Sequence, residues 1–223
     1  MKAWFLFCLL LTILCFGATG IVWQNRQQWL PDQVPTHWNA AGEADAWVPR
    51  ERALPSLLVS PCFMVGMMAL MLVLPWLSPL HFKIEPFRPT FDYMMSLLVF
   101  LFAYIQTILL LGSMEVIQEM GRWMIGGVLL VLSALGRSMG KITRNFWVGI
   151  RTPWTLASAP VWRETHRLAA WTFTLGGLMG FALVVCDLPM IGLGLFLAGA
   201  LFPVGYSLWL YKRLESQGKL GEE

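Results

Sequence analysis

Long apolar stretches separated by short charged segments make up most of the chain. A helix that crosses the hydrocarbon core of a membrane needs about 20 mainly apolar residues. Five stretches of 19 to 28 residues contain no Asp, Glu, Lys or Arg. A sixth, between Arg122 and Arg137, has only 14 such residues, but long arginine side chains can extend from it toward the interface. The pattern predicts six spans, over about residues 3–23, 54–77, 93–113, 120–137, 168–186 and 189–211.

The composition agrees with a membrane protein. Hydrophobic residues make up 57% of the chain, charged residues only 13%, and the mean hydropathy is +0.62. A soluble domain carries roughly 25% charged residues, so soluble and disordered classes are excluded. The net charge of +3 is small, and direct binding of nucleic acid is not expected. The predicted fold class is all-α, a polytopic membrane protein with about six transmembrane helices.

The basic residues predict the orientation of these helices. With the N-terminus inside, 12 of the 16 Lys and Arg residues fall in inner segments. Because basic residues accumulate on the cytoplasmic side, both termini are expected in the cytoplasm. The apolar run after Lys2 is longer than that of a signal peptide, so we expect it to remain as the first helix.

The predicted spans and loops divide the chain into two parts. Residues 1–78 hold the first two spans and an outer loop, residues 24–52, whereas residues 79–223 hold four spans and an inner loop, residues 137–167. No predicted span has an Asp, Glu, Lys, Arg or His near its centre, which weighs against ion-coupled transporters. Tyr104, Gln106 and Thr107 in the third span are expected to form hydrogen bonds between helices.

The outer loop combines aromatic, turn-forming and ionisable residues. Its tryptophans and histidine suit the headgroup layer, so one interpretation is a loop folded onto the membrane surface. The other is a contact site for an extracellular ligand, in which rigid aromatic side chains supply affinity. A metal site of His37, Glu43 and Asp45 would lack any standard ligand spacing. The candidate ligand-binding residues are His37, Trp38, Asn39, Gly42, Asp45 and Trp47.

The inner loop mixes basic residues with Asn, Gly, Thr, Pro and Trp. Pro153 keeps Thr152 extended, Gly149 favours a turn, and Ser158 with Pro160 resembles a helix start. Residues of these types predict one folded structure that binds a partner or serves as a structural motif. Its candidate residues are Arg144, Asn145, Gly149, Arg151, Thr152, Pro153, Trp154, Thr155, Trp162 and His166.

Two other interpretations of the inner loop remain open. Basic residues and tryptophans also anchor loops on anionic lipid, at about 1 kcal/mol per charge. An enzymatic interpretation would make His166 an acid–base group and Arg144 or Arg151 a phosphate clamp. No Ser/His/Asp set or carboxylate pair accompanies them. We therefore expect no enzyme, no cofactor and no metal.

The inner motif, from Asn145 through Gly149–Thr155 to Trp162 and His166, resembles the SdpI immunity-protein family. The outer motif, Pro35-x-His37-Trp38-Asn39-x-x-Gly42-x-x-Asp45, is similar to a domain of unknown function, DUF1648, that often precedes it. The resemblance implies a six-span protein of the bacterial inner membrane. In this family the founding member protects its producer from a secreted toxic peptide and draws a small winged-helix repressor to the membrane.

Two functional hypotheses follow. In the first, a secreted antimicrobial peptide binds outside through Trp38, Trp47 and His37, and the inner loop then offers Arg151, Trp154 and Trp162 to a small repressor. In the second, the protein is a transporter or handles lipid, and Arg144, Arg151 and His166 converge to hold a phosphate headgroup. Membrane lipid is an expected partner in both.

Overall fold

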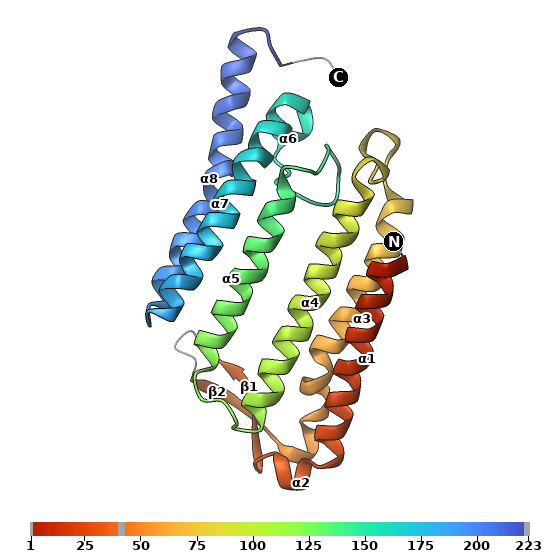
Figure 1. Cartoon of the computed structure of the whole chain (residues 1–223), viewed down its shortest axis with the longest axis vertical. Helices are drawn as coiled ribbons and strands as arrows, with labels where there is room; N and C mark the ends of the chain where they lie inside the picture. The colour runs from red at the N-terminus through yellow and green to blue at the C-terminus, as the bar shows by residue number, and fades with distance from the viewer. Residues whose placement is uncertain (1, 40–42, 221–223) are drawn as a thin grey trace. The chain divides into compact units, whose positions relative to one another are not determined.

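The computed structural model describes residues 2–39 and 43–220, and nearly all of its regular structure is helical (Figure 1). Three short 3-10 turns, Arg50–Arg52, Leu80–Phe82 and Glu85–Phe87, join longer elements. The helices are α1 (Lys2–Gln24), α2 (Arg26–Trp29), α3 (Leu54–Leu77), α4 (Arg88–Ser113), α5 (Met120–Met139), α6 (Pro153–Ala157), α7 (Ala159–Val185) and α8 (Pro189–Ser216), and the strands are β1 (Gln33–Trp38) and β2 (Ala44–Pro49).

Every predicted span corresponds to a long helix. Five helices, α1, α3, α4, α7 and α8, are long and apolar enough to cross a membrane. The fourth predicted span forms the regular 20-residue helix α5, but it is not among these five. Arg122 and Arg137 near its ends lower its hydropathy. The predicted helix start at Ser158 and Pro160 is confirmed, because α7 runs unbroken from Ala159.

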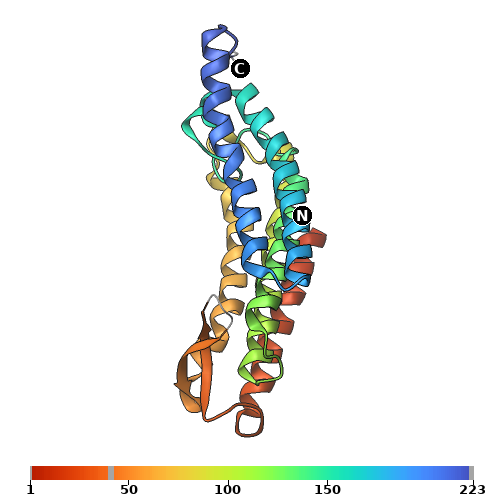
Figure 2. The same ribbon diagram turned by 90° about the vertical axis from the view of Figure 1, so that its left-hand side faces the viewer.

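The outer loop departs from the all-helical expectation. Strands β1 and β2 pair antiparallel as a hairpin, with Gln33 opposite Pro49 and Trp38 opposite Ala44 (Figure 2). The register shifts between Pro35 and His37, and again before Trp38. Proline cannot donate a ladder hydrogen bond and is tolerated at bulges, so this irregularity accommodates Pro35.

The chain forms two compact units, residues 1–70 with 95–128 and residues 71–94 with 129–223. In the first unit, Cys8, Met64 and Val99 belong to a buried apolar cluster. Gln106 is buried among the helices, and its Nε2 donates to Thr19 Oγ1 at 2.8 Å and to the Leu57 carbonyl at 2.9 Å. The prediction of interhelical bonding is confirmed for Gln106.

In the second unit, α7 and α8 form a tight antiparallel pair (Figures 1 and 2). A Cβ at Gly192 would clash with the Gly180 carbonyl, so these two glycines permit the close approach. Ser133 of α5 donates to the Thr174 carbonyl of α7 at 2.9 Å. Close glycine contacts and hydroxyl bonds between helices are the usual means of packing within a membrane.

Candidate functional site

The β-hairpin presents His37 and Asp45 together on an exposed surface. These residues lie on opposite strands, and His37 Nδ1 is 2.5 Å from Asp45 Oδ1. Trp47 on β2 is also exposed, with 52% of its surface accessible. The structure thus places three of the predicted ligand-binding residues on the exposed surface of one small hairpin, where His37 and Asp45 are hydrogen-bonded and Trp47 offers a rigid aromatic ring.

The hairpin is anchored at its base, near the start of β1. Val34 is fully buried and packs in an apolar cluster with Leu30 and Leu110. Ser113 of α4 donates weakly to the Pro35 carbonyl at 3.5 Å. The exposed hairpin residues therefore stand on a fixed base, which reduces the entropy lost when a ligand binds.

Asn39 closes the turn of the hairpin through its contacts with Glu43. Its backbone N–H donates to the Glu43 carbonyl at 2.9 Å, and its Oδ1 accepts from the Glu43 backbone N–H at 3.1 Å. Trp38 is only half-buried, and Gly42 lies outside the described residues. Within residues 2–39 and 43–220, no group of three His, Cys, Asp or Glu side chains can hold a metal ion.

Arg50 at the base of the hairpin was not predicted. Its guanidinium donates to the Leu30 carbonyl at 2.9 Å, to Gln27 Oε1 at 2.9 Å and to Asp32 Oδ1 at 2.7 Å. Arg50 thereby ties the end of β2 to the chain before β1. Only the fold reveals this role, because the three acceptors lie 18 to 23 residues away in sequence.

The inner segment, residues 140–158, is built around the buried side chain of Asn145. Its Oδ1 accepts from the backbone N–H groups of Trp147 and Val148, both at 2.8 Å. Its Nδ2 donates to the carbonyls of Thr143 and Val148, both at 3.0 Å. One amide side chain thus satisfies four backbone groups in a turn.

His166 joins this segment to α7. Its Nε2 accepts from the Ile150 backbone N–H at 2.9 Å, and its Nδ1 lies 2.8 Å from the Trp162 carbonyl. An accepting Nε2 requires Nδ1 to carry the proton, so these bonds select one neutral tautomer. The ring is buried and stacks on Trp162 at a centroid distance of 4.0 Å. Trp162 Nε1 in turn donates to the Ile142 carbonyl at 2.9 Å.

Gly149 is required by both conformation and space. Its φ is 108°, a region that favours glycine. A Cβ at this position would clash with the His166 ring and would lie 2.9 Å from Ile142 Cδ1. The predicted turn at Gly149 is confirmed, and the contact with His166 gives its physical reason.

Thr152 and Thr155 form a capping box at the start of α6. The Thr155 backbone N–H donates to Thr152 Oγ1 at 3.2 Å, and the Thr152 N–H donates to Thr155 Oγ1 at 2.9 Å. Pro153 occupies the first helical turn, where no N–H donor is needed. Thr152 Oγ1 also lies 3.2 Å from Ser207 Oγ of α8.

The two arginines of the inner segment contact the backbone. Arg144 donates to the Leu156 carbonyl at 3.3 Å and lies over the Phe82 ring at 5.7 Å. Arg151 donates to the Phe146 carbonyl at 2.5 Å. Both His166 nitrogens are also bound to backbone groups, so the ring offers no free nitrogen for acid–base chemistry in this conformation.

The accessible rim of the inner segment differs from the predicted one. Phe146, which was not singled out, is 46% exposed, and Arg151 and Pro153 are exposed beside it. Trp154 is half-buried. Trp162 is buried under His166, so the prediction that it faces a partner is wrong for this conformation. Its aromatic surface stabilises the segment instead.

Comparison with protein families agrees with this geometry. Residues 141–207 match the SdpI/YfhL protein family, and residues 10–65 match the domain of unknown function DUF1648. Together the two matches support an SdpI-family protein with an N-terminal DUF1648 region. The first match covers nearly all of the inner segment, α7 and most of α8, and the second covers the hairpin, α2 and parts of α1 and α3. No curated protein and no solved structure matches the chain. As an SdpI-family protein with five strongly apolar long helices, it is a multi-pass membrane protein of the immunity type.

Proposed function

We propose that this SdpI-family protein resides in the bacterial cytoplasmic membrane and protects its producer from a secreted toxic peptide. The peptide binds to the outer hairpin. The observation that carries the proposal is the exposure of Trp47 on the same hairpin as the His37–Asp45 couple, whose first strand is buried at Val34 and Pro35. A rigid aromatic with few rotatable bonds contributes affinity at low entropic cost.

The proposal extends to a cytoplasmic partner, a small winged-helix repressor, at the rim of the inner segment. Phe146, Arg151 and Pro153 are accessible there, and Asn145 and His166 hold their backbone in place. A pre-ordered surface loses little entropy on association. A peptide bound outside can alter this rim only if it binds two conformations with different affinities.

The outer site is tested in the native host. A strain that lacks the protein is complemented with the wild type, Trp47→Ala or Trp29→Ala. The membrane potential of these cells is then measured in culture medium that contains the peptides secreted by the host. Trp29 is the matched control, because it is also exposed but lies on α2 rather than on the hairpin. We expect wild type and Trp29→Ala to protect, and Trp47→Ala to fail at equal membrane abundance. Protection by Trp47→Ala would refute the hairpin site.

The inner site is tested by affinity capture. Tagged wild type and Arg151→Ala are solubilised from host membranes, and co-purifying species are identified by mass spectrometry. A small DNA-binding protein held by the wild type and lost with Arg151→Ala supports the partner surface. Retention by both variants would place the contact elsewhere.

The alternative of transport or lipid handling by the inner loop is not favoured. It requires Arg144, Arg151 and His166 to converge with free polar atoms on one pocket. Each of these side chains is instead bonded to backbone groups of the inner segment or of α7.

A further inference from the structure

Four cationic side chains outside the motif lie at neighbouring ends of α5 and α7. Arg137 is in the last turn of α5, and Lys141 follows one turn later. Arg163 and Arg167 lie one turn apart near the start of α7. All four are exposed. Arg163 and Arg167, four residues apart, share one face of α7. Lys141 lies in the turn after α5, where its backbone N–H donates to the Ser138 carbonyl at 3.0 Å, so each helix end carries two positive charges.

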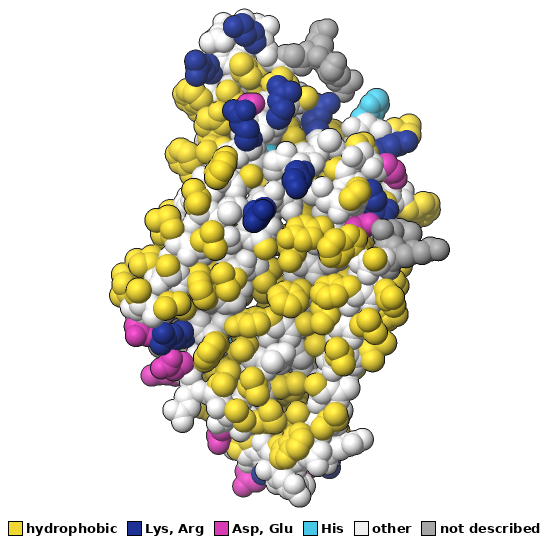
Figure 3. Space-filling view, viewed as in Figure 1, with side chains coloured by type: hydrophobic (Ala, Val, Ile, Leu, Met, Phe, Trp, Pro, Cys, Tyr) yellow, Lys and Arg dark blue, Asp and Glu magenta, His cyan; other side chains and the backbone are white. Residues whose placement is uncertain are grey.

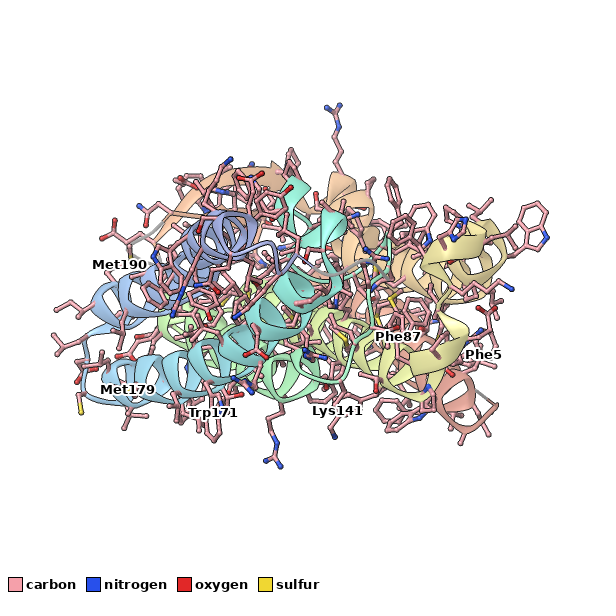
Figure 4. The ribbon with its side chains drawn as sticks, turned by 90° about the horizontal axis from the view of Figure 1, so that it is seen from above. Phe5, Phe87, Lys141, Trp171, Met179 and Met190 are labelled. Carbon is pink, nitrogen blue, oxygen red and sulfur yellow. The ribbon has the colours of Figure 1, made fainter. Side chains whose placement is uncertain are left out.

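The two pairs adjoin because α5 and α7 touch at this level. A Cβ at Gly140 would lie 3.8 Å from Ala170 Cβ and 3.9 Å from Arg167 Cα. Figure 4 shows Lys141 and Trp171 projecting on the same side of the helices. Figure 3 shows basic side chains gathered on this surface. We call Arg137, Lys141, Arg163, Arg167 and Trp171 the cationic face.

Only part of this charge is neutralised within the described chain. Glu164 lies 3.7 Å from Arg163 and 2.5 Å from Arg167. Among the residues that the structure describes, Arg137 and Lys141 have no ion-pair partner. One carboxylate thus faces four cations, and the surplus favours an anionic ligand.

The surface below the charges is apolar. Trp171 is 64% exposed, and Leu130 of α5 and Leu178 of α7 are exposed farther along the same helices. Tryptophan prefers the level of the headgroups, with apolar side chains beside the acyl tails. An acidic protein would leave this apolar surface uncovered, whereas a phospholipid covers it with its chains.

We propose that the cationic face binds an anionic phospholipid of the cytoplasmic leaflet. Arg137 and Lys141 hold the headgroup phosphate, Arg163 and Arg167 add long-range attraction, and Trp171 packs against the glycerol and upper acyl region. The positive-inside tendency explains the sign of these charges. It does not explain their convergence on one helix pair above an exposed tryptophan.

The test uses full-length protein in neutral detergent, titrated with phosphatidylglycerol or phosphatidylcholine and examined by native mass spectrometry. We expect the wild type to retain phosphatidylglycerol in preference to phosphatidylcholine. Arg137→Gln/Lys141→Gln should lower that retention about thirtyfold, since each of the two charges near an anionic surface contributes about 1 kcal/mol. Lys212→Gln/Arg213→Gln removes the same charge from α8, where Lys212 pairs with Glu215, and should retain the lipid.

Several results would overturn the proposal. Equal retention of both lipids by the wild type would indicate that the cationic face has no specific lipid-binding site. Equal loss of phosphatidylglycerol from both variant pairs would indicate the same. Full competition by free glycerol phosphate would indicate a soluble phosphate ligand, and lipid-independent capture of an acidic protein would indicate a protein surface. Arg137→Lys/Lys141→Arg keeps the charges, so it should bind as the wild type and shows that loss is not due to misfolding.

Discussion

The Ile150 backbone N–H donates to Nε2 of His166 at 2.9 Å, across 16 residues of sequence. This bond fastens the inner segment onto α7. Because the other ring nitrogen is bonded to the Trp162 carbonyl, the imidazole connects two backbone groups through hydrogen bonds. His166 is therefore a structural residue in this conformation.

Replacing His166 by phenylalanine tests whether these two hydrogen bonds stabilise the inner segment. His166→Phe keeps an aromatic ring against Trp162 but leaves the Ile150 N–H without its acceptor, which costs about 1–3 kcal/mol. We expect a lower free energy of unfolding in detergent micelles, followed by tryptophan fluorescence in denaturant. His81→Phe changes an exposed histidine and should leave stability near wild type. Equal stability of both variants would contradict the structural role.

Gly149→Ala should be destabilising for two reasons. The residue has a φ of 108°, and the added Cβ would meet the His166 ring. Strained backbone of this kind costs about 1–3 kcal/mol. Gly205→Ala, in α8, adds a Cβ with no neighbour within 4 Å and should match or exceed wild-type stability. A thermal shift assay distinguishes the two, and a stable Gly149→Ala would show that the turn relaxes.

Asn145→Asp removes the two amide donors while keeping the shape of the side chain. The carboxylate would then face the carbonyls of Thr143 and Val148. We expect a loss of about 1–3 kcal/mol or more, with proteolytic cleavage appearing between residues 140 and 158. Asn25→Asp changes a residue whose amide makes one exposed bond and should resist proteolysis. Undiminished resistance of Asn145→Asp would argue against the four-bond turn.

The contact of α7 with α8 gives a fourth prediction. In Gly192→Ala the new methyl group would clash with the Gly180 carbonyl, whereas in Gly194→Ala it meets open space. Only the first substitution should lower the thermal midpoint in micelles. If both variants melt alike, the helices do not approach as closely as the structure indicates.

The spans were predictable because burial in a membrane imposes one simple rule, a long apolar run. The helix start at Ser158 and the turns at Asn39 and Gly149 followed from local residue preferences. The hairpin was not predicted, because Pro35 argues against a strand unless a bulge accommodates it. The positions of His166 and Trp162 could not be predicted either, since their partners lie 16 and 20 residues away.

The most direct test of the proposed function places a photo-crosslinking residue on the hairpin. Benzoylphenylalanine replaces Trp47 or, as the control, Trp29, and the native host is irradiated while it secretes its peptides. We predict an adduct between a secreted peptide and the protein labelled at position 47, and none at position 29. No adduct at position 47, or equal adducts at both positions, would contradict binding of the peptide by the outer hairpin.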